Sequence, residues 1–591
     1  FWQAWTFRWR SWHWALADRA HHLPQPLANY ALALLLGAKD QTLYADNPKI
    51  QELGLIHLFS LSGFHVAFLL ALVRWLGRRL GLYREITLAI MAVVLPSFYW
   101  LTACPPILVR AVVAGEGRIL RQAGGWRVDP VTIWSWSLLV ALAVHPQILL
   151  TVGGQLSFAL TLALTLMPAT WPSWQKGVFL SVLTFPIIVA QQYVWNCWQT
   201  VANLLAVPIF STVILPTVLV AFLLVPVPGL APTCNWIVAS FDQTIAWVGS
   251  WPGQVVVGAL AWPVLLTLFC LPWFAIGANH RCRRWLVSTW IVVLLFGWTT
   301  VRWRSTGEYT TFDIGQGDAA VLREPWNRSV TLIDTGGKVS FQRPEFGQNS
   351  GNQSPASQAK SQEGLARSVI VPYLHALGIG RINTLSLSHQ DQDHLGDARV
   401  ILTTFRVDQV LVPAGLPNQP AFQRKVKPYL NGAKVVEGTD QVQVSHLPLK
   451  ILHPFQPGIG ENEDSLALAG RLGPLTLFTA GDLDQMGEAA IQAKYSNFRP
   501  DIVKFGHHGS KTATNPTVMA TWRPKYGLIS AGRDNRYGHP NQETLETARA
   551  NQMIVYDTRR QGMLRYVYDL NRKGYFEVTS SHDLTDPKKS N

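Results

Sequence analysis

The first half of the chain contains long apolar runs in close succession, and these runs constrain the fold more than any other feature. Several of them exceed the roughly 18–20 residues that a helix needs to cross about 30 Å of hydrocarbon. A core helix of a soluble protein would be shorter and would carry a polar face. We therefore predict about seven to nine membrane spans, with candidates near 57–76, 86–104, 131–150, 153–168, 178–195, 200–225, 255–276 and 285–301.

The composition changes after Arg304, and this change predicts two domains. The 591 residues are on average 48% hydrophobic and 15% charged, but nearly all of the 25 tryptophans precede Arg304. The later part alternates strand-like runs with helical patterns, as soluble α/β domains do. We predict a polytopic α-helical membrane domain at 27–304 and a soluble domain at 305–578.

Three further segments flank or interrupt these domains. Residues 1–26 mix tryptophan with arginine, which is typical of a membrane interface, although a truncated domain would leave such a remnant too. Residues 338–366 are rich in Gln, Ser, Gly and Asn and lack an apolar period, so we predict a disordered insertion. We expect residues 579–591 to form a polar tail.

Charge and cysteine content narrow the function only a little. The net charge of +14 favours anionic partners, either nucleic acid or lipid headgroups, but basic clusters flank the helices of any membrane protein. The five cysteines all lie in the apolar half without a C-x-x-C pair, which predicts neither a zinc-thiolate site nor a disulfide framework. Arginines both precede and follow the last apolar run, so the positive-inside rule leaves the orientation of the soluble half open.

Several apolar runs contain polar groups that a simple anchor does not need. His65 follows a cluster of small residues, Arg110 lies in a charged helical stretch, and Gln155 follows two glycines. Ionisable groups at membrane depth indicate function by default, whereas helix packing and snorkelling are the alternatives for each residue. We take His65, Arg110 and Gln155 as candidates for lining a channel.

The soluble half contains a dense set of metal-ligating side chains directly after a strand-like run. In His389-Gln-Asp391-Gln-Asp393-His394, alternate residues of an extended loop face the same way, and His394 turns toward a second point beside them. Imidazole and carboxylate suit a hard-to-borderline divalent ion, and two neighbouring clusters suit a two-metal hydrolytic site. A solvated polar loop is the alternative interpretation.

The chain downstream repeats the same pattern of an apolar run followed by a ligand. Asp482 follows one such run, His507 and His508 follow the next, and a third leads through a Gly-rich turn to His539. Strand ends that each deliver a ligand to one edge of a sheet are how metal hydrolase sites are built. The repetition therefore favours a metal site over a solvated loop.

Further motifs accompany these residues in both halves. The stretches are Asp313-x-Gly315-Gln-Gly317-Asp318, Leu332-Ile-Asp334-Thr-Gly336, Ser388-His389-x-Asp391-x-Asp393-His394-x-Gly396, Asn462-x-x-Ser465, Gly481-Asp482, His507-His508-Gly509-Ser510 and Asn535-x-Tyr537-Gly538-His539-Pro540 in the soluble half, and His57-Leu-Phe-Ser-Leu-Ser-Gly-Phe-His65, Gln155-Leu-Ser157-Phe and Asn203-Leu-Leu-Ala-Val-Pro208 in the apolar half.

These stretches resemble the ComEC family of bacterial competence DNA-uptake channels. The soluble half resembles the metallo-β-lactamase fold in the version attached to those channels, and the apolar half is similar to their competence membrane domain. The joint occurrence in this order is more specific than either half alone, because metallo-β-lactamase domains serve many chemistries.

The resemblance implies a multi-pass channel of the cytoplasmic (inner) membrane that passes single-stranded DNA during natural transformation. It also implies a soluble αββα domain that degrades the non-transported strand as a metal-dependent DNA phosphodiesterase. The implied partners are single-stranded DNA, double-stranded DNA as it arrives, membrane lipid, a competence DNA receptor, a cytoplasmic translocation ATPase and further copies of the chain.

The sequence also departs from the family pattern. Asp391 replaces the second histidine of the wider superfamily motif, although the competence branch often has aspartate there. Asp397 stands where a second glycine is common. Family members often carry an OB-fold domain before the membrane part, and we expect none within this sequence.

If the domain is a nuclease, two divalent ions, either Mn²⁺ or Zn²⁺, would polarise the phosphodiester and activate the attacking water. The expected ligands are His389, Asp391 and one of His507 and His508 for the first ion, and Asp393, His394 and His539 for the second, with Asp482 bridging.

We favour His507 as the ligand of this pair because it lies closer to the strand end. His508 would then act on the leaving oxygen, so His508, Asp393 and Asp482 are the expected catalytic residues. Residues expected to position the ligands are Asp318, Asp334, Asn462 and Ser465, although turn capping explains the two aspartates about as well.

Two other functions compete with a channel that carries a nuclease. The chain could be a membrane-anchored metallohydrolase of another phosphodiester, but a simple anchor needs no kinked helices with polar groups. It could also be a pure channel whose soluble domain binds DNA or metal without cleaving.

Overall fold

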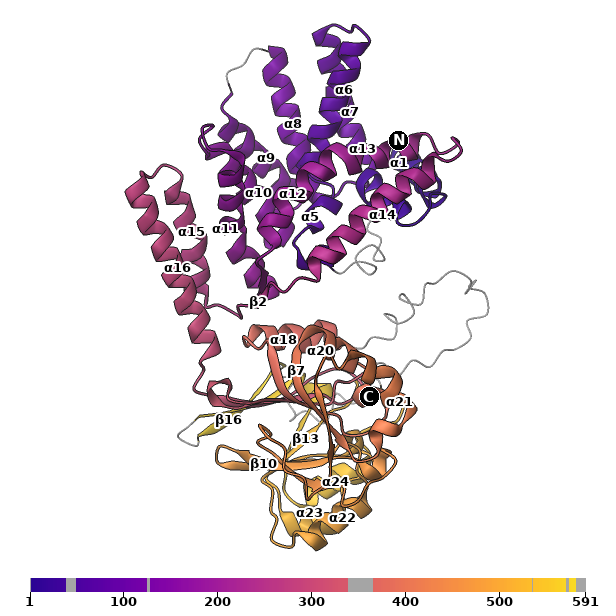
Figure 1. The fold of residues 1–591 in the computed structure, drawn as a ribbon, viewed down its shortest axis with the longest axis vertical. Coiled ribbons are helices and arrows are strands. Elements are labelled where there is room, and N and C mark those ends of the chain that lie inside the picture. Colours follow the sequence, from indigo (N-terminus) through magenta and orange to yellow (C-terminus); the bar gives the residue numbers. More distant parts are fainter. Residues whose placement is uncertain are drawn as a thin grey trace. The chain divides into compact units, whose positions relative to one another are not determined.

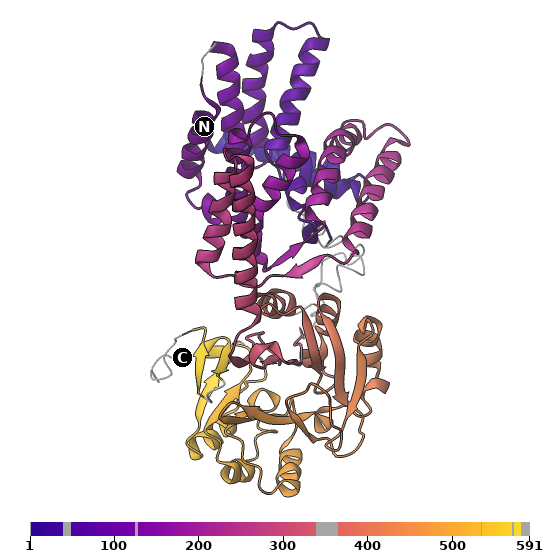
Figure 2. The same ribbon diagram turned by 60° about the vertical axis from the view of Figure 1, so that its left-hand side comes forward.

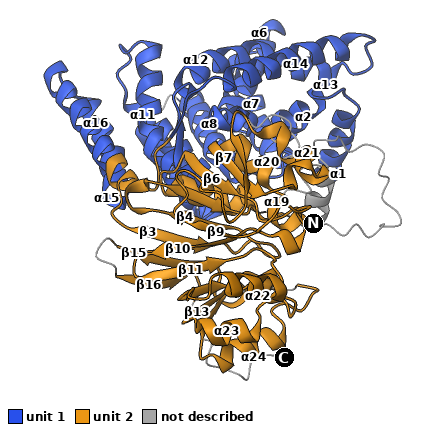
Figure 3. Ribbon diagram, turned by 60° about the horizontal axis from the view of Figure 1, so that its bottom comes forward, with its two compact units in different colours: residues 1–255, 260–297 blue, residues 256–259, 298–591 orange. Residues whose placement is uncertain are grey.

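A computed structural model describes residues 2–38, 49–124, 128–337, 365–533, 535–569 and 573–580. The chain divides into two compact units, which Figure 3 colours separately. Unit 1 comprises residues 1–255 and 260–297, and unit 2 comprises residues 256–259 and 298–591. Almost all of the predicted insertion and most of the predicted tail lie outside the described residues.

Unit 1 is helical (Figures 1 and 2). Its helices are α1 (Trp2–His21), α2 (Leu27–Ala31), η1 (Leu32–Leu36), α4 (Lys49–Glu52), α5 (Ile56–Phe59), α6 (Gly63–Arg79), α7 (Arg84–Leu101), α8 (Pro106–Gly124), α9 (Pro130–Val144), η2 (Ile148–Leu150), α10 (Val152–Leu166), α11 (Ser173–Gln192), α12 (Gln199–Ile209), η3 (Phe210–Ile214), α13 (Leu215–Leu223), α14 (Leu230–Gly249), α15 (Trp262–Ala275) and α16 (His280–Arg302), the last continuing into unit 2. Strands β1 (Val194–Asn196) and β2 (Gln254–Val256) pair as a small sheet.

Four helical segments of the described residues are long and apolar enough to cross a membrane: Arg84–Leu101, Ser173–Gln192, Gln199–Leu223 and His280–Arg302. Each overlaps one of the predicted spans. The other predicted spans contain the helices α6, α9, α10 and α15, which are shorter. The prediction at 255–276 placed the start too early, because β2 and an extended segment occupy its first residues and the helix begins at Trp262, with proline in its first turn.

The apolar helices of unit 1 leave much of their hydrophobic surface uncovered by protein. Only 11% of the apolar window in α16 is buried, and Trp285 and Phe296 on this helix are 70% and 63% exposed. Soluble monomers rarely expose contiguous apolar surface on this scale. A lipid environment explains such a surface.

The helical structure is interrupted between α5 and α6, at the predicted cluster of small residues. Ser62 has an extended backbone, and its N–H donates to Nδ1 of His65 at 3.2 Å, which forms one half of a capping box. Helix α6 therefore starts at Gly63, and His65 lies in its first turn, 3% exposed.

Unit 2 contains two β-sheets. The eight-stranded sheet has the order β16-β15-β3-β4-β5-β6-β7-β8, and the six-stranded sheet has the order β14-β13-β12-β11-β10-β9. The strands are β3 (Gly307–Thr311), β4 (Ala320–Arg323), β5 (Val330–Ile333), β6 (Arg381–Ser386), β7 (Arg406–Pro413), β8 (Lys434–Gly438), β9 (Lys450–His453), β10 (Ala467–Leu472), β11 (Leu475–Thr479), β12 (Ile502–Lys504), β13 (Tyr526–Ile529), β14 (Ile554–Asp557), β15 (Leu564–Tyr568) and β16 (Gly574–Val578).

The two sheets pack face to face, and helices cover both outer faces. Along β4, Ala320 and Leu322 join the core between the sheets, whereas Val321 faces the helix layer, as the two-residue period of a strand requires. The helices of the two outer layers are η6 (Ala366–Ile370), α18 (Val371–Ala376), α20 (Ala398–Thr404) and α21 (Pro420–Lys425) on the larger sheet, and α22 (Gln485–Lys494), α23 (Pro516–Trp522) and α24 (Gln542–Ala550) on the smaller. The predicted αββα architecture is confirmed.

The strand directions explain where the predicted ligands meet. Strands β5, β6 and β7 are mutually parallel, and so are β11, β12, β13 and β14. The loops after β5, β6, β11, β12 and β13 therefore leave their sheets at the carboxyl ends of parallel strands. These loops carry Asp334, the segment 387–396, Asp482, the His507–His508 pair and His539.

Candidate metal centre

The loop after β6 is held by backbone hydrogen bonds from neighbouring loops. Asp318 N–H donates to the carbonyl of Asp393 at 3.0 Å, and Thr335 N–H donates to the carbonyl of His394 at 2.7 Å. Gly317 has φ +134°, and a Cβ on it would lie 2.6 Å from the Asp393 carbonyl oxygen. Only glycine allows this approach, so the Gly317 turn fixes the loop that carries four of the predicted ligands.

A first group of ligand atoms surrounds one oxygen of Asp482. His389 Nε2 lies 3.7 Å from Asp482 Oδ2 and 3.6 Å from Asp391 Oδ2, and His507 Nε2 lies 3.8 Å from Asp482 Oδ2. Ligands bound at about 2.0–2.1 Å to one tetrahedral ion lie about 3.4 Å apart. The separations in this group are close to that spacing.

A second group meets the other oxygen of Asp482. His394 Nε2 lies 3.2 Å from Asp482 Oδ1, and His508 Nε2 lies 3.2 Å from Asp393 Oδ2. The ligand atoms of Asp393, His394 and His508 all fall within 4.8 Å of one another. The rings of His389 and His394 are 4.1 Å apart, so the two groups adjoin.

The hydrogen bonds at this site leave its central atoms unsatisfied. His389 Nε2, His394 Nε2 and Asp482 Oδ1 are buried without a hydrogen bond, although the last two atoms face each other at 3.2 Å. Buried polar atoms without partners are costly, and a divalent cation satisfies nitrogen and oxygen lone pairs together. The residues at this site therefore fit a metal centre with two adjoining positions.

Asp334 fixes the orientation of the ligands behind the centre. Its carboxylate accepts hydrogen bonds from Ser388 N–H at 2.7 Å, from Ser388 Oγ at 2.8 Å and from His394 Nδ1 at 2.9 Å. Ser388 Oγ in turn lies 3.0 Å from His389 Nδ1. With Nδ1 engaged in this way, each imidazole directs its Nε2 lone pair toward Asp482, as histidine ligands of metals do.

Asp318 and Lys504 support His508. The Nδ1–H of His508 donates to the Ser530 carbonyl at 3.0 Å and lies 3.4 Å from Asp318 Oδ1, while Lys504 Nζ pairs with Asp318 Oδ2. Burial raises the pKa of the Asp318 carboxyl, but the charges of Lys504 and His508 outweigh burial and lower it. Asp318 is therefore anionic and fixes the tautomer of His508.

The two consecutive histidines adopt left-handed backbone conformations, which direct their rings differently. His507 has φ +48° and His508 has φ +56°, and non-glycine residues adopt such values uncommonly. His508 is 2% exposed, whereas the side chain of His507 is 31% exposed and its Nδ1 lies 3.1 Å from Thr512 Oγ1. His507 thus closes the first group from the solvent side, and His508 joins the second.

His539 lies beside these two histidines without joining either close group. Its ring is 5.6 Å from that of His507 and 6.4 Å from that of His508, and Tyr537 stacks on it at 5.7 Å with an interplanar angle of 10°. Its Nδ1 is buried without a hydrogen-bond partner.

Asn462 and Ser465 lie in the turn after β9. The Oγ of Ser465 accepts a hydrogen bond from Asp482 N–H at 3.3 Å, and Gly481, at φ +51°, approaches Ser388 so closely that a Cβ would lie 2.6 Å from the Ser388 Cβ. Asn462 contributes through its backbone carbonyl, which accepts from Ser465 N–H at 3.1 Å.

The electrostatics of the centre couple cation and proton binding. Burial lowers the pKa of His508, but Asp318 and Asp482 outweigh burial and raise it to about 10. Burial also lowers the pKa of His394, but the carboxylates of Asp482 and Asp334 together outweigh burial and raise it. Because metals bind the deprotonated imidazole, an ion entering here displaces protons.

Three residues that contact the predicted ligands were given no role in the sequence analysis. Ser388 contacts both His389 and His394, Ser530 accepts from His508, and Thr512 contacts His507. Each lies within five positions of a motif residue or at a strand end, which is the signal that was available.

Comparison with known proteins places both units in families. A family model described as competence protein matches residues 34–284, and one described as metallo-beta-lactamase superfamily matches residues 313–482. ComE operon protein 3 of Bacillus subtilis (strain 168) is 29% identical over 96% of this chain and 75% of its own length. Competence protein ComA of Neisseria gonorrhoeae is 26% identical over 87% of this chain and 71% of its own.

The chain therefore combines a competence-protein region with a metallo-β-lactamase superfamily region. Another relative is the uncharacterized protein YcaI of Escherichia coli (strain K12), which is 24% identical over 91% of this chain and 70% of its own length. Among solved structures, a mutant of the β-hydroxylase CmlA aligns with 54% of this chain and 65% of its own at 15% identity, with a TM-score of 0.28, which is too low to carry an argument.

The competence part of this protein holds the three predicted channel residues. Arg110, 8% exposed on α8, donates from Nε to Ser157 Oγ at 2.8 Å. Its Nη2 lies 2.9 Å from the position that a Cβ on Gly63 would occupy, at the first residue of α6. The Nε2 of His65 is buried without a hydrogen-bond partner, and Gln155 Nε2 donates to the Leu149 carbonyl at 3.0 Å.

Proposed function

We propose that this protein is the DNA-uptake channel of natural transformation. It spans the cytoplasmic membrane several times and passes one DNA strand, while its metallo-β-lactamase domain hydrolyses the strand that is not transported. The family matches and the four long apolar helices support the first part. A DNA receptor, a translocation ATPase and further copies of the chain are the partners expected for this role.

One observation carries the hydrolase part of the proposal: three buried ligand atoms without hydrogen-bond partners converge at Asp482. We assign the first ion to His389, Asp391, Asp482 and His507. We assign the second to Asp393, His394, His508 and the other oxygen of Asp482. The second set replaces the expected His539 with His508, because His508 Nε2 faces Asp393 at 3.2 Å.

Two bound divalent ions supply Lewis-acid stabilisation of the phosphate and an attacking water of lowered pKa. The residues of the chain orient this chemistry. Asp482 would offer one carboxylate oxygen to each group of ligands, and Asp334 keeps His394 in the ligating tautomer. His539, whose ring lies 5.6 Å from that of His507, is left to contact the phosphodiester and the leaving oxygen.

The transport part of the proposal rests on the surroundings of Arg110. Within the described residues no ion pair joins Arg110 to a carboxylate, and its guanidinium lies at the amino end of α6, where the helix dipole is also positive. Two positive elements side by side in an apolar unit favour an anion. The phosphates of a passing strand supply it.

The first experiment assays the full chain in lipid nanodiscs on end-labelled single- and double-stranded DNA with Mn²⁺, Zn²⁺ or EDTA. We expect metal-dependent cleavage that is lost in Asp393→Ala and retained in Asp408→Ala, which removes a carboxylate of β7 that pairs with Arg381 at the start of β6. Intact DNA with every metal, while two ions per chain are bound, would leave a channel with a non-cleaving domain.

Metal content separates the roles of His508 and His539. We expect His508→Ala to lose about one ion per chain together with activity, and His539→Ala to keep both ions while activity falls. Loss of an ion in His539→Ala and none in His508→Ala would restore the ligand set expected from the sequence.

A further inference from the structure

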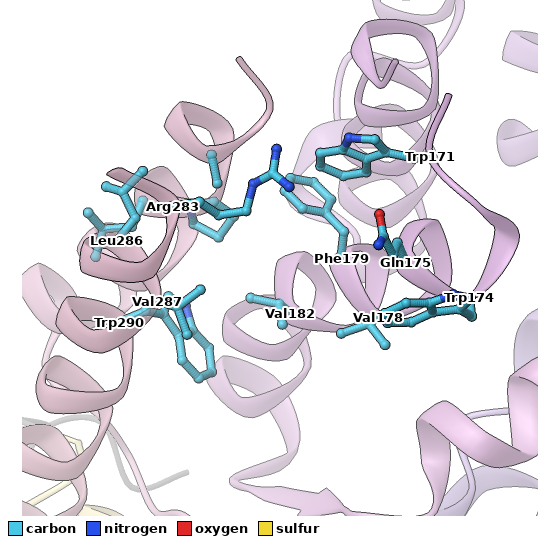
Figure 4. A pocket seen from close by; sticks show the side chains of 13 residues that line it. Trp171, Trp174, Gln175, Val178, Phe179, Val182, Arg283, Leu286, Val287 and Trp290 are labelled. Carbon is cyan, nitrogen blue, oxygen red and sulfur yellow. The ribbon is translucent and has the colours of Figure 1, made fainter. Parts of the chain in front are cut away.

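Unit 1 contains a cavity of about 320 Å³ between α11, α15 and α16, apart from the metal centre and from Arg110. Figure 4 shows that side chains of α11 and α16 line it from two sides. The volume reaches the range of about 300–1,000 Å³ in which proteins hold small ligands. Its walls are formed mainly by tryptophan, phenylalanine, valine, leucine and proline, with Gln175 and Arg283 as the polar side chains.

Arg283 is the one charged side chain that lines this cavity, and its guanidinium is incompletely satisfied. Its Cζ lies 4.9 Å from the centre of the Trp171 ring, and its Nη2 donates to the Ala278 carbonyl at 3.3 Å. Its Nε is buried without a hydrogen-bond partner. No carboxylate of the described residues forms an ion pair with it, so the cavity has one positive end and apolar walls.

The position of the cavity along its helices matches a membrane interface. Helices α11 and α16 are both long and apolar enough to cross a membrane, and the cavity begins at the amino ends of both. Trp171 lies two residues before α11 and Trp174 lies in its first turn, and Arg281 and Arg284 lie exposed beside Arg283 at the start of α16. Tryptophan and clustered arginine are typical of the headgroup region, and basic pockets between membrane helices bind anionic headgroups.

We propose that this cavity binds one anionic phospholipid. The headgroup phosphate accepts hydrogen bonds from Arg283 beside Trp171, and an acyl chain runs between the helices along Val182 and Trp290. This inference rests on the membrane location of the proposed function. A single-stranded DNA segment fits less well, because a groove for a nucleic-acid backbone repeats its positive charges and this cavity has one.

The test uses the full chain extracted from membranes and exchanged into nanodiscs of phosphatidylcholine with or without phosphatidylglycerol. Native mass spectrometry then counts the phospholipids that stay bound after transfer to detergent. We expect one retained phosphatidylglycerol per chain, and about tenfold weaker retention in Arg283→Gln, the change expected for loss of one charged hydrogen-bonded contact. Arg284→Gln is the matched control, because it removes the same charge one position away from the cavity lining.

A second variant fills the cavity without changing its charge. Val182→Trp is expected to lower retention of phosphatidylglycerol while the circular dichroism of the helices stays unchanged. Equal retention in all variants, preference for phosphatidylcholine, competition by a short oligonucleotide, or saturation by inorganic phosphate alone would overturn the proposal. Sedimentation with membranes is measured in parallel, so a chain that is not membrane-bound would instead refute the proposed location.

Discussion

Units 1 and 2 bury charged side chains in opposite ways. In unit 2, Glu308 is fully buried, and its carboxylate receives Arg565 Nε at 3.0 Å, Arg323 Nη2 at 3.4 Å and the Tyr373 hydroxyl at 3.1 Å. In unit 1, Arg110 is almost as deeply buried, and its Nε–H donates to the Ser157 hydroxyl at 2.8 Å.

The difference indicates which buried charges require a ligand from outside the chain. A buried charge with partners from its own chain stabilises the fold, whereas a buried charge without one is costly unless something else neutralises it. By this criterion, and for the described residues, the anionic metal centre at Asp482 is an open cluster of unit 2, and the cationic surroundings of Arg110 are an open cluster of unit 1. The first fits metal cations and the second fits phosphate anions.

The largest expected effect comes from the open cluster of unit 2. Asp482→Asn removes the charge that both groups of ligands share, so we expect DNA cleavage by nanodisc-embedded protein to fall by about three orders of magnitude or more, with loss of bound metal. Measured turnover and metal content check this. An Asp482→Asn protein that keeps both ions and most of its activity would show that the cluster is not the catalytic centre.

Disruption of the hydrogen-bonded network around Glu308 in unit 2 is expected to lower stability rather than metal binding. Glu308→Gln leaves Arg323 buried without its counter-charge, which typically destabilises a protein by about 3–5 kcal/mol. We expect hydrogen exchange in β3, β4 and β15 to accelerate accordingly, while bound metal is retained under native conditions. Unchanged exchange would mean that the network contributes little, and the contrast between the units would fail.

Substitution of Arg110 is expected to impair DNA uptake and to change the stability of the protein hardly at all. Arg110→Gln is expected to lower transformation by about tenfold or more, because a guanidinium–phosphate contact is lost, while the amount of protein in the membrane stays unchanged. Arg110→Lys keeps the charge and should recover part of the uptake. If protein and uptake disappear together in Arg110→Gln, the residue serves helix packing.

Much of the candidate metal centre could be predicted, because most of its residues are indicated by their immediate neighbours in the sequence. The alternation of His389, Asp391 and Asp393 can be read along one loop, and Asp482 and His507 follow short apolar runs directly. The partner of His508 could not be predicted, because it depends on two consecutive left-handed residues that turn its ring toward Asp393. Asp334 was expected to position the ligands, but its contact with His394 depends on the parallel pairing of β5 and β6, which spacing does not encode.

The helical unit was predictable in kind and less so in detail. Apolar length identifies the helices, but the boundary of a helix depends on local backbone chemistry. The extended segment ahead of Trp262 was absorbed into a predicted span because valine and alanine are apolar in strands and helices alike. The contact between Arg110 and Ser157 links residues 47 positions apart, beyond what a hydropathy pattern can report.

Glu488 provides a finer test of the contrast between the two units. This carboxylate of α22 is 1% exposed, and its described partners are backbone N–H groups, from Asn515 at 2.6 Å and Thr514 at 3.2 Å. Burial raises its pKa to about 7, against the two N–H groups that favour the ionised form. It is thus a buried charge of unit 2 whose partners are dipoles, intermediate between Glu308 and Arg110.

The sign of the resulting pH dependence follows from linkage. The folded pKa of about 7 exceeds the unfolded value of about 4.3, so the folded state holds the proton more tightly. The contribution to stability is complete below pH 4.3 and is lost as the pH rises through 7. Between pH 6 and pH 8 we expect the metal-free protein to lose about 1 kcal/mol of local stability that Glu488→Gln does not lose. Hydrogen exchange of the Thr514 and Asn515 amides, compared at each pH between the unsubstituted protein and Glu488→Gln, measures this loss of stability. Parallel curves for the two proteins would mean that Glu488 does not titrate in this range.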